Sequence, residues 1–154
     1  EKSKAIVPPW PTCYRFSDSN IFSIAVWSPS GTRVAYTDRN VITIVDQRHG
    51  VIHRINNYHG VYFCDLKFSP DGRYLVSTDD YSIVKLWDNN VAGNYGLLRE
   101  WNVREDIGGI FRPCVIDISA CSKYIVVATY AGNLVVIKRD EDGETVRSLT
   151  LQPG

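Results

Sequence analysis

The sequence has few of the features that assign a chain to a common functional class. It contains no methionine, and no apolar run approaches the length of about 18 residues that a membrane span requires. Lys and Arg together number 17, Asp and Glu together number 17, and the formal charge is zero. No net field therefore attracts the whole molecule to nucleic acid or to an anionic membrane. The missing methionine favours a fragment of a larger protein.

The residue types that bind metals or cofactors form no recognisable pattern. The four cysteines contain no Cys-x-x-Cys pair, and the three histidines supply no second half of a zinc motif. We therefore predict no metal and no cofactor. Reduced cysteines suit an intracellular compartment, so we expect the protein in the cytoplasm or the nucleus.

Catalytic motifs are also missing from the sequence. There is no Gly-x-Ser-x-Gly elbow, no His-Glu-x-x-His motif and no glycine-rich loop that opens a helix. Asp79 and Asp80 are adjacent and could chelate a hard cation weakly, but adjacent strand residues point to opposite faces. The acidic residues 140–142 precede Gly143 in a predicted hairpin turn. We predict that the chain is not an enzyme.

The sequence does contain an internal repeat, which is the mark of a repetitive architecture. Three segments share one order of residue types, with Ser-Pro-Ser-Gly in the first and Ser-Pro-Asp-Gly in the second: residues 24–31, 65–72 and 115–122. The step from Ser28 to Ser69 is 41 residues, and the step from Ser69 to Ser119 is 50. Asn and Gly cluster in residues 89–111, so we predict a loop insertion there.

Each copy has the pattern of short β-strands, with β-branched and aromatic runs bounded by Pro, Gly, Asp and Asn. We expect four strands in each copy: 22–27, 33–37, 41–46 and 51–56, then 62–68, 74–78, 83–87 and 97–103, then 114–118, 124–129, 133–138 and 144–151. A four-stranded sheet with two apolar faces cannot cover both alone, so neighbouring sheets stack around an axis. The predicted fold is an all-β propeller of four-stranded antiparallel blades, about three of them, in an incomplete ring.

The second copy resembles a WD40 repeat in order and spacing. His59 is followed nine positions later by Phe68 of a Phe-Ser-Pro-Asp-Gly run, and the copy ends in Leu-Trp-Asp at residues 86–88. The first copy instead ends in Val-Asp and the third in Lys-Arg. The resemblance implies that residues 1–20 are an N-terminal extension or the outer strand of a neighbouring blade. It also implies three blades, at residues 21–57, 58–111 and 112–154.

The resemblance also implies a buried hydrogen-bond network within the second blade. In the family, a His, a Ser or Thr, an Asp and a Trp form this network, and three of the roles fall to His59, Ser77 and Trp87. The family expects its Asp six residues before the Trp, where this chain has Tyr81. A buried imidazole and indole need polar partners, so we interpret these side chains as structural.

WD40 propellers usually bind partners on one rim, which is built by the loop before the first strand and by the loop between the second and third strands. By the family spacing, Tyr62 and Arg112 lie in the first kind of loop, and Arg39, Tyr81 and Tyr130 in the second. Tyr and Arg are the residue types enriched at interface hot spots. The resemblance therefore implies a scaffold that binds other proteins or peptide segments, and the remaining blades of the same propeller.

Two other functions remain open at this stage. Aromatic residues beside basic ones also stack on bases and contact phosphates, so a nucleic-acid-binding propeller is the second choice. Residues 27–36 also resemble a blade of the propellers that gate prolyl-oligopeptidase-type hydrolases. The Leu-Trp-Asp ending of the second copy is typical of the WD40 type instead.

Overall fold

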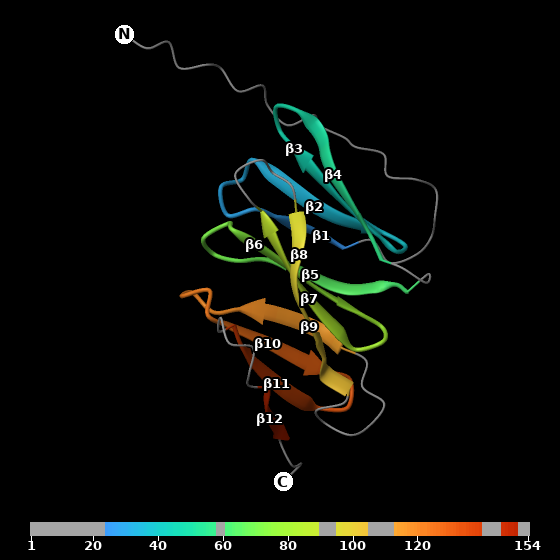
Figure 1. The fold of residues 1–154 in the computed structure, drawn as a ribbon, viewed down its shortest axis with the longest axis vertical. Helices are drawn as coiled ribbons and strands as arrows, with labels where there is room; N and C mark the ends of the chain where they lie inside the picture. Colours follow the sequence, from blue (N-terminus) through green and yellow to red (C-terminus); the bar gives the residue numbers. More distant parts are fainter. Residues whose placement is uncertain (1–23, 58–60, 90–94, 105–112, 140–145, 151–154) are drawn as a thin grey trace.

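The computed structural model describes residues 24–57, 61–89, 95–104, 113–139 and 146–150. These residues form three four-stranded antiparallel sheets, and in each sheet the strands lie side by side in the order of the sequence. Figure 1 shows the three sheets stacked along the long axis of the molecule, one after another in chain order. The all-β propeller-blade architecture predicted from the sequence is confirmed, and the sheets do not close into a ring.

We call the three sheets blades 1, 2 and 3. Blade 1 consists of β1 (Ala25–Trp27), β2 (Arg33–Asp38), β3 (Val41–Asp46) and β4 (Gly50–Asn56). Blade 2 consists of β5 (Phe63–Phe68), β6 (Tyr74–Asp79), β7 (Ile83–Asn89) and β8 (Tyr95–Asn102). Blade 3 consists of β9 (Pro113–Ile118), β10 (Tyr124–Thr129), β11 (Asn133–Lys138) and β12 (Val146–Thr150).

The repeated Ser explains why the first hairpin of every blade has the same shape. In each case the Ser hydroxyl accepts a hydrogen bond from the backbone N–H five residues later, at 3.0 Å for Ser28, 2.8 Å for Ser69 and 3.0 Å for Ser119. The fourth residue of each turn has a positive φ, which suits glycine in blades 1 and 2. Ser122 adopts this φ in blade 3, so the divergent third copy builds the same turn without Pro or Gly.

Alternation along the strands gives each blade two apolar faces, and the core lies between the blades. On β6, Leu75 packs toward blade 1 and Val76 packs toward blade 3. Polar contacts reinforce the second interface, where Asp65 accepts a hydrogen bond from the Ile116 N–H at 2.8 Å and Lys67 lies 3.4 Å from Asp117. Blade 2 is therefore covered on both faces by its neighbours.

The longer step between the second and third copies contains a strand. The strand expected at 97–103 is present as β8 (Tyr95–Asn102), inside the range 89–111 that was predicted as an insertion, and β7 continues to Asn89. β8 completes blade 2 by pairing with β7. The proposed extension at residues 1–20 lies outside the described residues and stays a prediction, as do the blade boundaries.

The two outer blades each present an apolar face that no described blade covers. Trp27 of β1 is 58% exposed, whereas Phe68, at the same position of blade 2, is buried. On blade 3, Tyr124 is 42% exposed, whereas the equivalent Tyr74 of blade 2 is buried. We call these two surfaces the open faces.

Candidate partner-binding rim

Antiparallel connectivity places two kinds of loop at the same end of each blade. The chain enters the first strand at this end, and it returns there between the second and third strands. We call this end the binding rim and the other end, with the Ser turns, the opposite rim. The described residues of the binding rim include four of the five predicted partner-binding residues: Arg39, Tyr62, Tyr81 and Tyr130. The fifth, Arg112, lies outside the described residues.

Three tyrosines on the binding rim are exposed to solvent. The exposed fraction is 42% for Tyr62, 61% for Tyr81 and 80% for Tyr130. Tyr62 lies beside the β6–β7 turn, because its carbonyl accepts a hydrogen bond from the Asp80 N–H at 3.1 Å. The structure therefore brings Tyr62 and Tyr81 to the same edge of blade 2, while Tyr130 lies on blade 3.

The β6–β7 turn is held by the buried carboxylate of Asp79. Its Oδ1 accepts hydrogen bonds from the backbone N–H groups of Tyr81 and Ile83, both at 3.1 Å. Burial raises the pKa of Asp79, and these hydrogen bonds oppose that rise only in part. In the β10–β11 turn, Thr129 takes the corresponding role and accepts from the Asn133 N–H at 3.2 Å. Asp79 and Thr129 thus fix the turns that display Tyr81 and Tyr130.

A second anchor of the binding rim is Asn57, which the sequence reasoning missed. Asn57 is buried, donates to Asp79 Oδ2 at 3.2 Å, and accepts from Lys85 Nζ at 2.8 Å. The side chain therefore ties the segment between blades 1 and 2 to the turn that carries Tyr81. A single Asn at the end of a predicted strand gives no signal of such a long-range role.

The buried network predicted for blade 2 is described in part. The Trp87 indole N–H donates to Ser77 Oγ at 3.0 Å, and both side chains are buried. His59 lies outside the described residues, so its role stays a prediction. The family resemblance had placed the Asp of this network at position 81, which is occupied by Tyr81. In the structure the carboxylate that holds the turn belongs to Asp79, two residues earlier.

Arg39 occupies the β2–β3 turn with a φ of 55°. Side chains other than Gly, Asn and Asp seldom adopt this conformation, because Cβ crowds the backbone. Arg39 is exposed on the same end of the molecule as the tyrosines. It adds a cation to the binding rim at blade 1.

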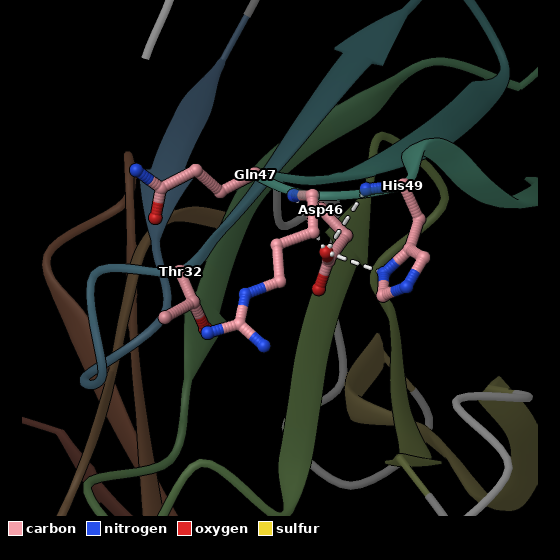
Figure 2. A pocket seen from close by; sticks show the side chains of 5 residues that line it. Thr32, Asp46, Gln47 and His49 are labelled. Carbon is pink, nitrogen blue, oxygen red and sulfur yellow. Dashed lines mark hydrogen bonds and ion pairs between the residues drawn. The ribbon is translucent and has the colours of Figure 1, made fainter. Parts of the chain in front are cut away.

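The opposite rim carries a cavity of about 240 Å³, lined by Thr32, Asp46, Gln47, Arg48 and His49. Figure 2 shows the Asp46 carboxylate joined to the His49 ring and backbone, and the Asp46–His49 Nδ1 distance is 2.9 Å. Burial alone would raise the pKa of Asp46. Hydrogen bonds from the Arg48 N–H, His49 and Arg33 outweigh burial and lower it to about 2.

The polar groups of the opposite rim mostly satisfy one another. Arg33 contacts Asp46 at 3.2 Å and donates to Asn89 at 2.8 Å, so it links blade 1 to blade 2. The His49 ring is hydrogen-bonded to Asp46, and the Thr32 hydroxyl is hydrogen-bonded to Ser30. Within the described part of the chain, no three His, Cys, Asp or Glu side chains cluster as metal ligands do.

Among the residues that the structure describes, Cys64 and Cys121 form no disulfide bond. No helix in the described ranges is both long and apolar enough to cross a membrane.

Comparisons with known proteins agree with the fold. The family model "WD domain, G-beta repeat" matches residues 51–88, and the comparison with curated proteins found no match. Among solved structures, the β-propeller domain of Cps50 (Swd1) from Myceliophteria thermophila is similar with a TM-score of 0.66 and 19% identity over 82% of this chain. Raptor from Chaetomium thermophilum has a TM-score of 0.69 and 14% identity over 84% of this chain.

A third similar structure is assigned to an enzyme, so the fold by itself does not decide between binding and catalysis. It is a protein from Bacteroides fragilis that is assigned as a 6-phosphogluconolactonase, and its structure is similar with a TM-score of 0.65 and 16% identity over 82% of this chain. The chain spans only 42% of the Cps50 domain, 37% of the lactonase chain and 12% of Raptor. Residues 51–88 are therefore a WD40 repeat, and the three sheets have the fold of β-propeller blades.

Proposed function

We propose that the protein is a non-catalytic scaffold that binds other proteins through its binding rim. The observation that carries this proposal is the exposure of Tyr62, Tyr81 and Tyr130 at the same end of neighbouring blades. Each of these residues lies at a strand end or in a turn that the sheet holds in place. A partner would therefore meet aromatic side chains on a rigid support.

The physical case for a protein partner rests on the contacts that an exposed tyrosine can form when a partner covers it. A Tyr side chain buries a large area on binding, and its hydroxyl can still form a directional hydrogen bond. Ordered turns reduce the entropy that is lost when a partner binds. Similar structures from Cps50 and Raptor support the fold and leave the partner of this chain unassigned.

The open faces support a second part of the proposal, which concerns the remaining blades. A propeller blade buries both faces against neighbours, as blade 2 does here. Trp27 and Tyr124 lie on the two faces that lack this cover. We propose that further blades, from the same or another chain, cover both open faces.

An affinity pull-down with the intact protein tests the scaffold function. The test variant is Tyr62→Ala with Tyr81→Ala, and the control is Arg48→Ala with His49→Ala on the opposite rim. We expect the wild type and the control to recover the same specific proteins and the test variant to lose them, as measured by quantitative mass spectrometry. The expected loss is about 30-fold or more, since two truncated hot spots cost about 2 kcal/mol or more together.

Three other results of this pull-down have distinct meanings. Loss in the control variant alone would transfer the binding site to the opposite rim. Recovery of nucleic acid without protein would replace the scaffold function with the nucleic-acid function. A chain that supplies further blades would be recovered by both variants, because neither pair of substitutions touches the open faces.

A further inference from the structure

The binding rim of blade 2 combines two exposed phenol rings with a carboxylate. Asp80 lies directly before Tyr81 in the β6–β7 turn, and its backbone N–H donates to the Tyr62 carbonyl at 3.1 Å. Tyr62 and Tyr81 are both exposed, and Asp80 is half-buried. The three residues therefore lie at one edge of blade 2, and together we call them the blade 2 rim surface.

The Asp80 carboxylate is incompletely paired. Its Oδ1 is shielded from solvent and finds no hydrogen-bond partner among the residues that the structure describes. Asp79, which lies next in the chain, is occupied by the hydrogen bonds of the turn. A carboxylate oxygen shielded from water keeps much of its electrostatic field, because little solvent lies near it to screen the charge.

The charged groups around the blade 2 rim surface include both signs. Lys85 donates to Asn57 and lies 3.7 Å from Glu100, so its charge is already partly matched. Arg104 follows β8 and is exposed. Val103, which directly precedes Arg104, contacts the β6–β7 turn, because its N–H donates to the Ser82 carbonyl at 3.0 Å. Among the described residues, Lys85 is therefore partly neutralised, and the half-buried Asp80 is the acidic residue of the blade 2 rim surface.

We propose that the blade 2 rim surface binds an arginine side chain from an extended segment of the partner protein. A guanidinium group stacks on the faces of Tyr rings, and it also pairs with carboxylates. Tyr62 and Tyr81 supply the rings, and Asp80 supplies the negative charge. This inference rests on the proposed function, because it assigns the partner chemistry of the same rim.

Titration of the intact protein with a small arginine probe tests the partner chemistry. The protein carries ¹⁵N-tyrosine, and the probe is N-acetyl-arginine methylamide. We expect saturable shifts of the Tyr62 and Tyr81 amide signals, with Tyr130 on blade 3 unchanged. The uncharged isostere N-acetyl-citrulline methylamide should bind about three- to fivefold more weakly, which corresponds to the loss of one exposed cation–π contact.

An Asp80→Asn variant separates the charge from the rings. It should weaken arginine binding about threefold or more, whereas Asp117→Asn on β9 should leave binding unchanged. Equal binding of arginine and citrulline, or an unchanged affinity in Asp80→Asn, would overturn the proposal. The Tyr62→Ala, Tyr81→Ala variant could lose its protein partners while the arginine probe shifts neither tyrosine signal. That result would support the binding rim and would show that the arginine proposal is wrong.

Discussion

Replacing Trp87 with Ala should lower the free energy of unfolding by about 3–5 kcal/mol, the usual cost of removing a buried Trp. Trp87 is buried in the core between blades 1 and 2, where Leu66, Phe68 and Leu75 also pack. The substitution removes this packing and the hydrogen bond from the indole to Ser77. Urea unfolding followed by circular dichroism measures the change.

A Trp87→Phe variant separates the two contributions. Phe keeps most of the ring packing but cannot donate to the buried Ser77 hydroxyl. We expect a smaller loss of about 1–2 kcal/mol, since one buried polar group loses its partner. Equal effects of the Ala and Phe substitutions would show that the hydrogen bond dominates, and no effect of either would contradict the described core.

Lowering the pH should destabilise the fold through Asp46. Its pKa lies at about 2 in the folded protein, against a usual value of 3.8. A carboxylate whose pKa is lowered by folding contributes stability above its unfolded pKa and loses that contribution as the pH falls through the folded pKa. The contribution is present at neutral pH, starts to fall below about pH 5 and is lost by about pH 1–2.

The size of this effect follows from the contacts of Asp46 with Arg33, Arg48 and His49. Solvent screens part of the interaction, so we expect about 1–2 kcal/mol. An Asp46→Asn variant should lose stability at pH 7 and show a flatter dependence on pH between about 5 and 2. Asp117→Asn, which removes an exposed ion pair with Lys67, should cost less than about 1 kcal/mol and should keep the pH profile of the wild type. Parallel pH profiles for the wild type and Asp46→Asn would exclude Asp46 as the source.

The blade architecture could be predicted from the sequence because each blade is specified by patterns of a few neighbouring residues. The Ser of each first turn, followed by Gly in two copies, predicts a hairpin from a few neighbouring residues. Alternating apolar residues on β6 predict a strand buried on both faces, and Leu75 and Val76 do pack against different blades. These signals need no knowledge of distant parts of the chain.

The contacts that join separate segments could not be predicted in the same way. Asn57 and Asp79 are 22 residues apart and meet only because blade 1 packs on blade 2. Arg33 and Asn89 are 56 residues apart and meet for the same reason. Side chains of this kind are common in turns, so the sequence gives no sign of which distant partner each one finds. The strand expected at 97–103 is present as β8, and the Gly and Asn residues around it explain why residues 89–111 were also predicted as an insertion.

Amide hydrogen exchange of the intact protein, alone and with a partner recovered in the pull-down, tests the central claim most directly. The claim is that partners bind at the end of the blades that carries the β6–β7 and β10–β11 turns. We predict slower exchange on binding at residues 80–82 and 130–132, with unchanged exchange in the Ser turns at 29–32 and 120–122. Slower exchange confined to the Ser turns would contradict the claim and place the partner on the opposite rim.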